Sequence, residues 1–348
     1  MSKSFKVGNV NFNEKKCVII AEAGVNHNGS LKIAEKLISQ AKKAGADIIK
    51  FQTYKAKNLV TRKSPRFWNW SGEKKREGSQ FDSYERLDKF NEKEYRLLFK
   101  LCKKYKIEFM STPFDIEAVD MLYKIGVGGY KVASCDINNY QLLSKIAEKK
   151  LPILLSTGAS ELIEIKNALN FLKRKGAKNI CVMQCTLCYP TVSKDVNLKS
   201  ILSLKKIFPK NLIGFSDHSL GVNIPSSSVL YGVRVIEKHF TINKKLKKSA
   251  DHWLSVDPNE LSILRKNVDE LLSSMGDKNK KVLKCEYLTR RLARRSIVAK
   301  KNIKKGEKFN IYNIVPKRPG GGISPTNYFK VLGKKAKKKF VIDEKIKI

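Results

Sequence analysis

The feature that most constrains the fold of this chain is an alternation, repeated eight times, of a short apolar run with a segment of helical periodicity. The runs are almost continuously apolar, which is typical of parallel strands covered on both faces. Eight strand–helix units within about 250 residues predict an α/β fold, a closed (β/α)8 TIM barrel. An open doubly wound sheet is the alternative. The eight runs are residues 17–24, 46–53, 107–114, 129–134, 152–158, 179–186, 212–218 and 234–240.

The repeating pattern ends after a long helical segment at 258–276. The next residues, 277–290, are mostly polar and predict a linker. Short β-like runs broken by Gly- and Pro-containing turns then fill 291–348, which predicts a small, mostly β domain. We therefore expect a barrel domain over 1–276, the linker, and this second domain.

The gap between the second and third runs, 61–90, is unusually long and holds Trp68 and Trp70 among charged residues. A functional loop over the barrel mouth and an ordinary insertion with aromatic anchors both fit this composition.

The net charge of +39 raises nucleic-acid binding as a class of function. Of the 71 basic residues, however, 58 are Lys and 13 are Arg, whereas recognition of bases and phosphates by fork geometry favours Arg. The lysines are spread along the chain, mostly on expected exposed helix faces. We interpret them as solvated surface and expect no nucleic-acid partner.

We expect neither a membrane span nor a signal peptide in this chain. No apolar run approaches the roughly 20 residues that span a bilayer, and the N-terminal residues do not form a signal peptide. The seven scattered cysteines predict reduced thiols rather than a disulfide framework. We expect a cytoplasmic protein with no membrane partner.

Polar residues stand near the C-terminal end of every predicted strand, which is where a TIM barrel builds its active site. Eight such ends at one rim predict a binding site there. The polar residues are Glu22, Lys50, Gln52, Ser111, Thr112, Lys131, Ser134, Ser156, Thr157, Thr186, Tyr189, Ser216, Asp217, His218, Glu237 and His239.

Two of the four histidines, His218 and His239, end neighbouring strands. Two imidazoles at adjacent strand ends can share one metal ion and leave its other positions open for water or substrate. Two hydrogen-bonded histidines without a metal are the alternative. His27 and His252 follow the first and last strands and are candidates for a supporting or substrate-binding role.

Lys50 and Lys131 are predicted to point into the same rim. A buried ammonium without a nearby anion is costly, so the two lysines imply an anionic ligand or acidic partners. Phosphate and carboxylate are natural ligands, and Ser134, Ser156 and Ser216 could donate hydrogen bonds to them.

The stretch CVMQCTLCYP at 181–190 has cysteines at the spacing C-x3-C-x2-C, which raises an iron–sulfur cluster as a possibility. On a strand, Cys181 and Cys185 would share one face but lie about 13 Å apart. This separation is too large for two ligands of one cluster. We therefore interpret Cys185 as a small apolar filler near the end of the barrel.

The chain resembles the sialic acid (nonulosonic acid) synthase family. The matching stretches follow one another in family order along nearly the whole chain. They are IAEAGVNHNGS (20–30), IIKFQTY (48–54), MSTPFD (110–115), YKVAS (130–134), LSTGAS (155–160), CTLCYPT (185–191), GFSDHS (214–219), VIEKHF (235–240), ADH (250–252) and KRPGGGISP (317–325).

This resemblance implies a TIM barrel with a C-terminal antifreeze-like (SAF) domain, and a transferase that condenses phosphoenolpyruvate with an N-acylated mannosamine-type sugar. It further implies a divalent metal, Mn2+ or Mg2+, on His218 and His239. The phosphoenolpyruvate-binding groups would be Lys50, Thr112, Lys131, Ser134, Ser156 and Ser216.

The sugar would contact Glu22, Tyr189 and Asp251, and Arg318 would reach its acyl group from the partner subunit of a domain-swapped homodimer. Catalysis would depend on Glu22, Lys50, Lys131, His218 and His239, with Glu22 transferring a proton or orienting the sugar hydroxyls.

The sequence departs from the family pattern at three places, each of which bears on the acceptor sugar. Leu187 replaces a polar residue, Cys135-Asp136 replaces a Gly-Glu pair, and 61–83 has no clear counterpart of a family asparagine.

We expect an N-acetylneuraminate-type synthase acting on unphosphorylated N-acetylmannosamine or a close derivative. A 2,4-diacetamido-2,4,6-trideoxyhexose leading to legionaminic or pseudaminic acid is the alternative acceptor. A Schiff-base aldolase with Lys50 or Lys131 as nucleophile is less favoured.

Overall fold

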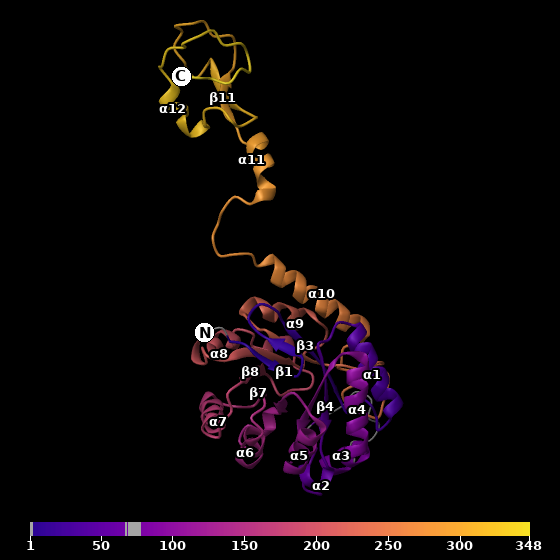
Figure 1. Cartoon of the computed structure of the whole chain (residues 1–348). Helices are drawn as coiled ribbons and strands as arrows, with labels where there is room; N and C mark the ends of the chain where they lie inside the picture. Colours follow the sequence, from indigo (N-terminus) through magenta and orange to yellow (C-terminus); the bar gives the residue numbers. More distant parts are fainter. Residues whose placement is uncertain (1–2, 67, 69–77) are drawn as a thin grey trace. The chain divides into compact units, whose positions relative to one another are not determined.

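The computed structural model describes residues 3–66, 68 and 78–348, and the chain divides into two compact units, Met1–Met275 and Gly276–Ile348. In the first unit, eight parallel strands pair in sequence order and the last returns to the first, so the sheet closes into the expected barrel (Figure 1). These strands are β3 (Val18–Gly24), β4 (Ile48–Thr53), β5 (Glu108–Pro113), β6 (Tyr130–Val132), β7 (Ile153–Ser156), β8 (Ile180–Cys185), β9 (Leu212–Asp217) and β10 (Val235–His239).

Helices cover the outside of the barrel, and their apolar stripes pack on the outward-facing strand residues. In the first helix Ser30 accepts a hydrogen bond from the Ile33 backbone N–H, and Ala34, Leu37 and Ile38 are fully buried. The covering helices are α1 (Leu31–Lys43), α4 (Glu92–Tyr105), α5 (Ile116–Ile125), α6 (Tyr140–Glu148), α7 (Leu162–Arg174), α8 (Ser200–Ile207), α9 (Asn223–Ser228) and α10 (Pro258–Ser274).

An N-terminal hairpin, β1 (Phe5–Val7) and β2 (Val10–Phe12), was not anticipated from the sequence. Val7 and Phe12 are fully buried against apolar residues that point into the barrel near the strand starts, so the hairpin fills that end. The fit is close: a Cβ on Gly128 would lie 2.1 Å from the Gly8 nitrogen. The sequence signal was available, because alternating apolar residues flank a Gly-Asn turn.

The described part of the 61–90 insertion contains helix α3 (Gln80–Leu87), which contacts the short helix α2 (Ala56–Leu59). Asp88 joins the two: Lys55 Nζ lies 2.7 Å from its Oδ1, and the Ala56 backbone N–H donates to its Oδ2 at 3.0 Å. Trp70 lies outside the described residues.

The second unit has its own apolar core, with Phe309 and Phe340 almost fully buried. It contains a two-stranded antiparallel sheet of β11 (Ser296–Ala299) and β12 (Ile314–Lys317), isolated β-bridges and helix α12 (Tyr328–Val331). Residues expected to form a polar linker include the short helices η4 (Lys284–Glu286) and α11 (Tyr287–Ala293, which runs past 290).

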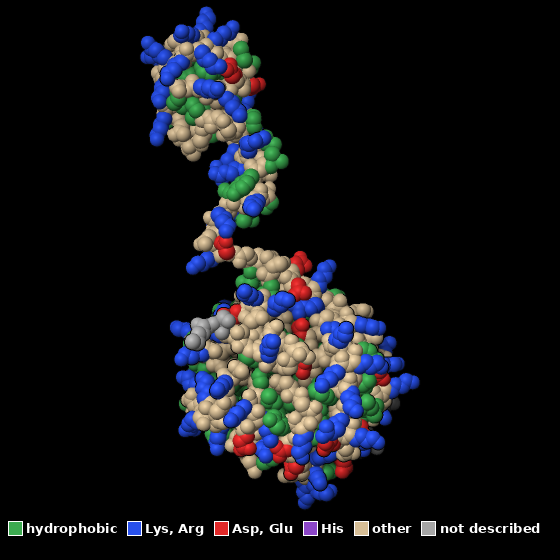
Figure 2. All heavy atoms as spheres, viewed as in Figure 1, with side chains coloured by type: hydrophobic (Ala, Val, Ile, Leu, Met, Phe, Trp, Pro, Cys, Tyr) green, Lys and Arg blue, Asp and Glu red, His purple; other side chains and the backbone are tan. Residues whose placement is uncertain are grey.

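The positive charge is distributed over the surface. Figure 2 shows Lys and Arg side chains scattered over the visible faces of both units rather than gathered in one patch. All seven cysteines are free thiols. Within the described residues, no helix is long and apolar enough to cross a membrane.

Candidate active site

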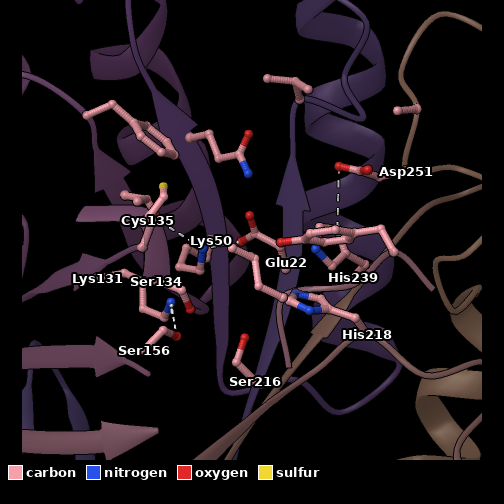
Figure 3. Close-up of a pocket in the computed structure, with 18 of the residues that line it drawn as sticks. Glu22, Lys50, Lys131, Ser134, Cys135, Ser156, Ser216, His218, His239 and Asp251 are labelled. Atoms are coloured by element: carbon pink, nitrogen blue, oxygen red, sulfur yellow. Dashed lines mark hydrogen bonds and ion pairs between the residues drawn. The ribbon is translucent and has the colours of Figure 1, made fainter. Parts of the chain in front are cut away.

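A cavity of about 210 Å³ opens at the C-terminal ends of the barrel strands. Side chains alternate along a strand, so every second residue points inward. Near the strand starts these inward residues are apolar, as in Ile48, Met110 and Leu154. Two residues further along each strand they are polar, as in Lys50, Thr112 and Ser156, and these three line the cavity. Figure 3 shows Lys50 and Ser156 among the labelled residues of the cavity.

The deepest part of the cavity, here called the charged floor, consists of Glu22, Lys50, Lys131 and Glu237, each at most 5% exposed. Lys50 Nζ lies 2.6 Å from Glu22 Oε2 and 3.8 Å from Glu237 Oε2. Lys131 Nζ lies 3.6 Å from Glu237 Oε1. Glu237 therefore bridges the two lysines. Glu22 and Glu237 are the acidic partners expected for them.

Burial and charge set opposite protonation tendencies for the two acids. Burial raises the pKa of Glu22 to about 7, although Lys50 opposes the change and Glu237 adds to it. Burial also acts against ionised Glu237, but Lys131 and Lys50 outweigh it and lower the pKa of Glu237. The floor thus pairs an ionised carboxylate with one that holds its proton near neutral pH.

Hydroxyl groups surround the two ammonium groups. Lys50 Nζ donates to Thr112 Oγ1 at 2.9 Å, and Lys131 Nζ donates to Ser156 Oγ at 2.7 Å. Ser216 Oγ donates to Glu237 Oε1 at 3.1 Å. Ser134 Oγ accepts from the Gly158 backbone N–H at 2.9 Å. The structure therefore places all six predicted phosphoenolpyruvate-binding residues around one cavity.

The imidazoles of His218 and His239 face one another across the cavity, with ring centroids 5.4 Å apart. Tyr189 packs on both rings, at 4.1 Å from His218 and 5.8 Å from His239. His218 Nδ1 lies 2.8 Å from the Thr186 carbonyl oxygen. A carbonyl only accepts, so Nδ1 carries a proton, and Nε2 is the ring nitrogen left for another ligand.

His239 is buried, and its Nδ1 has no hydrogen-bond partner; the closest acid is Asp251, with Oδ2 at 3.6 Å. Burial, and then the positive charge of His218 and the lysines, lowers the pKa of His239 well below its usual value. Burial raises the pKa of Asp251 to about 6, against the influence of His218.

These observations fit a metal ion at the two histidines. A buried ring nitrogen without a partner and a neutral imidazole are what a metal ligand requires. No three His, Cys, Asp or Glu side chains converge as a metal centre in the described parts of the chain. The protein would therefore supply two imidazoles, and water or substrate the remaining ligands.

Cys185 is a small buried residue near the end of the barrel, as expected, but it also contacts the site. The residue is buried, but its Sγ lies in the cavity 3.9 Å from His218 Nδ1. Burial disfavours the charged imidazole of His218, yet Cys185 and the Thr186 carbonyl oxygen outweigh it and raise the pKa of His218. Cys181 points into the apolar barrel interior, as the strand geometry required.

The outer part of the cavity, here called the aromatic wall, has a different character. Tyr54 lies at its centre, with Tyr84 edge-on at 5.4 Å and Phe114 at 6.1 Å. Trp68 packs edge-on against Tyr84 at 5.8 Å. Leu87 joins them at the cavity surface. The described part of the insertion thus forms a wall of the site, which favours the functional interpretation of 61–90.

Several rim residues named from the sequence lie elsewhere. Ser111 faces the outer side of the sheet, where its hydroxyl lies 2.6 Å from Thr53 Oγ1. His27 stacks on Phe90 at 4.1 Å, and His252 bonds Thr241 and Asn28. Neither histidine lines the cavity, so both hold loops together.

Asp217 also faces outward, where it pairs with Lys238. Arg318 is exposed in the second unit, directly after β12.

Sequence reasoning missed two parts of the site. The sequence placed Glu237 at a strand end but gave it no role, although its carboxylate contacts both lysines of the floor. Its signal was its two-residue spacing from His239, which places both on the same face of β10. The aromatic wall was missed because its members come from separate loops and meet only in three dimensions.

Together, the fold and the site define an enzyme of the TIM-barrel class with two buried lysines and two buried glutamates at the C-terminal strand ends. The NeuB family model matches residues 37–280 and the SAF domain model matches residues 294–347. The chain belongs to the NeuB family, whose synthases condense phosphoenolpyruvate with a sugar, and it carries a C-terminal SAF domain.

Two curated relatives illustrate the range of the family. The chain is 43% identical to an N,N'-diacetyllegionaminic acid synthase of Campylobacter jejuni, over 96% of this chain and 99% of the relative. It is 34% identical to the human N-acetylneuraminate-9-phosphate synthase, over 92% and 88%.

Among solved structures, it resembles the N-acetylneuraminic acid synthetase of Leptospira borgpetersenii, in complex with citrate. The TM-score is 0.73 at 33% identity, with 83% of this chain and 95% of that one covered.

Proposed function

We propose that this enzyme joins phosphoenolpyruvate to an unphosphorylated 2,4-diacetamido-2,4,6-trideoxyhexose, giving a nine-carbon 2-keto sugar acid of the legionaminic type. The observation that carries the proposal is the division of one cavity into a charged floor and an aromatic wall. The floor suits a small, highly charged anion, and the wall suits a largely apolar sugar.

At the floor, Lys50 and Lys131 would bind the phosphate and carboxylate of phosphoenolpyruvate, replacing part of their contact with Glu22 and Glu237. Thr112, Ser134, Ser156 and Ser216 would donate hydrogen bonds to the same oxygens. In a site closed to water these contacts are worth several kcal/mol.

The reaction forms a carbon–carbon bond and a carbon–oxygen bond to water, and it breaks the carbon–oxygen bond to phosphate. C3 of phosphoenolpyruvate attacks the aldehyde carbon of the open-chain sugar, and the aldehyde oxygen takes up a proton. Water adds at C2 and returns one proton to the carboxylate that protonated the aldehyde oxygen. The hydroxyl left on C2 becomes the ketone as phosphate leaves with the bridging oxygen and the second proton of the water. Glu22 is the proposed proton donor, because burial keeps its carboxyl protonated near neutral pH.

The acceptor end is argued from the wall. A 6-deoxy sugar with two acetamido groups presents methyl groups where other aldohexoses present a hydroxyl or a phosphate. Tyr54, Tyr84 and Phe114 offer these methyl groups an apolar surface. Among the described lining residues, the only lysines are the two at the floor and none is Arg, which disfavours a 6-phosphate.

The Campylobacter relative's name points the same way, since legionaminic acid derives from such a sugar. N-acetylmannosamine, the acceptor first expected, is the second candidate. Asp251 and Tyr189 would hold sugar hydroxyls at the inner end of the wall.

We propose His218 and His239 as the ligands of Mn2+ or Mg2+. The chemistry that such an ion supplies is Lewis-acid polarisation of a carbonyl. We further propose a cytoplasmic homodimer, domain-swapped so that Arg318 serves the partner's site. Light scattering on the purified chain tests the dimer.

A Schiff-base aldolase would need an uncharged lysine amine at the floor. Burial opposes a charged Lys50, but Glu22 and Glu237 outweigh it and raise the pKa of Lys50. This disfavours Lys50 as a nucleophile. Borohydride trapping of pyruvate on the protein, insensitive to EDTA, would support the aldolase instead.

The decisive experiment incubates the purified chain with phosphoenolpyruvate, Mn2+ and each candidate sugar, and follows phosphate release. We expect the diacetamido-trideoxyhexose to give the highest kcat/KM, N-acetylmannosamine a lower one, and its 6-phosphate the lowest. Preference for the 6-phosphate would contradict the assigned acceptor, and no release with any sugar would contradict the reaction.

A further inference from the structure

A buried ion pair lies on the opposite side of the sheet from the two imidazoles. Lys238 Nζ is 2.6 Å from Asp217 Oδ2, and the two side chains are each 1% exposed. They are adjacent in the pairing of β10 with β9. Both point outward, into a layer that is largely apolar, with Phe215, Ile236 and Phe240 among its members.

The pair also binds the chain that follows β9. Asp217 Oδ1 accepts from the Ser219 backbone N–H at 3.0 Å, and its Oδ2 accepts from the Ser219 hydroxyl at 2.9 Å. Lys238 Nζ donates to the Ser219 carbonyl oxygen. His218 therefore lies between two residues that are tied to each other, and His239 directly follows the lysine that ties them.

Stability alone does not explain this arrangement. Taking two charges out of water costs several kcal/mol for each ion, and apolar residues of similar volume are often as stable as the pair or more so. A pair of fixed geometry does, however, specify one backbone conformation. Here that conformation sets the directions of both imidazoles.

We propose that Lys238 and Asp217 are positioning residues for the two histidines. Neither touches the cavity, and their side chains face away from it. They fix the strand ends so that His218 and His239 hold their 5.4 Å separation. Outer-sphere partners of this kind change metal affinity or activity by about 10–100-fold when removed. The role of the pair in turnover rests on the proposed function; its effect on the two rings does not.

The test removes both charges together. The double variant Lys238→Met/Asp217→Asn leaves no unpaired charge and keeps an acceptor for Ser219. We expect a melting temperature close to that of the wild type, kcat reduced by about 10–100-fold, and KM for phosphoenolpyruvate within about twofold. Mn2+ affinity, measured by electron paramagnetic resonance without substrates, should weaken by a similar factor.

NMR of 15N-labelled histidine gives a readout that depends on neither metal nor activity. The ring resonances of His218 and His239 should shift or broaden in the double variant, whereas those of His27 and His252 should not. The control Lys244→Met removes a half-buried lysine paired with Glu260 at 2.6 Å outside the cavity. It should leave every measurement unchanged.

Unchanged ring resonances in a folded double variant would overturn the proposal, as would wild-type kcat and Mn2+ affinity. If the double variant does not melt cooperatively, Ser219→Ala replaces it, because this change removes one hydrogen bond to Asp217 and leaves both charges paired; the same ring shifts are expected at smaller amplitude. A wild-type enzyme that neither binds Mn2+ nor releases phosphate would contradict the proposed function instead, and the NMR comparison would still decide the role of the pair.

Discussion

The charged floor and the aromatic wall share one cavity but are built in different ways. The floor comes from inward-facing strand residues whose positions the barrel fixes, such as Lys50 and Glu237. The wall comes from loops and an insertion, with Tyr84 on α3 and Phe114 just after β5. If the proposed function is correct, the barrel sets the chemistry, and the choice of acceptor depends on loop segments, which tolerate change more readily than barrel strands do.

The largest expected effect is at the histidines beside the floor. His218→Ala should lower kcat by more than about a thousandfold, because Lewis-acid polarisation is worth several kcal/mol. The barrel should still fold, since the side chain faces the cavity. Phosphate release and a thermal melt check the two statements. Near-normal turnover would refute the metal assignment.

A matched control for that variant is His27→Gln. His27 is buried on Phe90 outside the cavity, so its replacement should lower the melting temperature and leave kcat per folded enzyme intact.

The next prediction tests whether a change in the floor affects binding of phosphoenolpyruvate more than binding of the sugar. Lys131→Met removes one ammonium from the floor and leaves Glu237 less compensated. KM for phosphoenolpyruvate should rise by about a hundredfold, with a smaller change in KM for the sugar. Steady-state kinetics with each substrate varied in turn checks this.

Lys145→Met serves as the control, because Lys145 pairs with Asp120 at 3.0 Å on the outer surface. If Lys131→Met changed the two KM values equally, the floor would not be selective for phosphoenolpyruvate.

A smaller effect is expected at the wall. Tyr84→Ala removes a ring in contact with Tyr54 and Trp68. KM for the sugar should rise by about tenfold, the value of an aromatic contact, and KM for phosphoenolpyruvate should not change. Tyr140→Ala is the control, since Tyr140 stacks on Phe171 at 4.6 Å on the outer helices. A rise in KM for phosphoenolpyruvate alone would reverse the assignment of floor and wall.

The last expected effect concerns the pH dependence of stability. The pKa of Glu22 is raised from 4.5 to about 7, so between these values the folded state binds a proton that the unfolded state does not. The wild type should therefore lose stability as pH rises from 4.5 to 7. The Glu22→Gln variant has no carboxyl to ionise at this position and should not show this loss. Its melting temperature relative to the wild type should therefore increase over that pH range and level off above it. A constant difference would mean that Glu22 ionises normally.

The sequence predicted the barrel because continuous apolar runs and helical stripes have distinct periods, and each strand formed within its predicted run. The inward direction of the floor lysines and of His218 and His239 was also predictable, because side chains along a strand alternate between its two faces. Glu237 also points inward by this alternation. Its position between Lys50 and Lys131, however, depends on how the strands are ordered around the closed barrel.

What the sequence could not show depends on long-range packing. Tyr54, Tyr84 and Phe114 are separated by loops of unpredictable path, so no local pattern joins them. We interpreted Cys185 as apolar because its contact with His218 is not visible in the sequence. Cys185 ends β8, whereas His218 follows the neighbouring strand β9. The outward ion pair escaped notice for a similar reason: Lys238 and Asp217 meet only when β9 and β10 pair.

The hairpin β1–β2 has a consequence for the order of events in the barrel. Val7 and Phe12 cover the end of the barrel opposite the cavity, and inward-facing residues such as Ile48, Met110 and Leu154 fill the interior between the two ends. Ligands would therefore enter the cavity from the side of the C-terminal strand ends. If phosphoenolpyruvate binds at Lys50 and Lys131 and the sugar against Tyr84, as proposed, we expect phosphoenolpyruvate to bind before the sugar and phosphate to leave after the sugar acid.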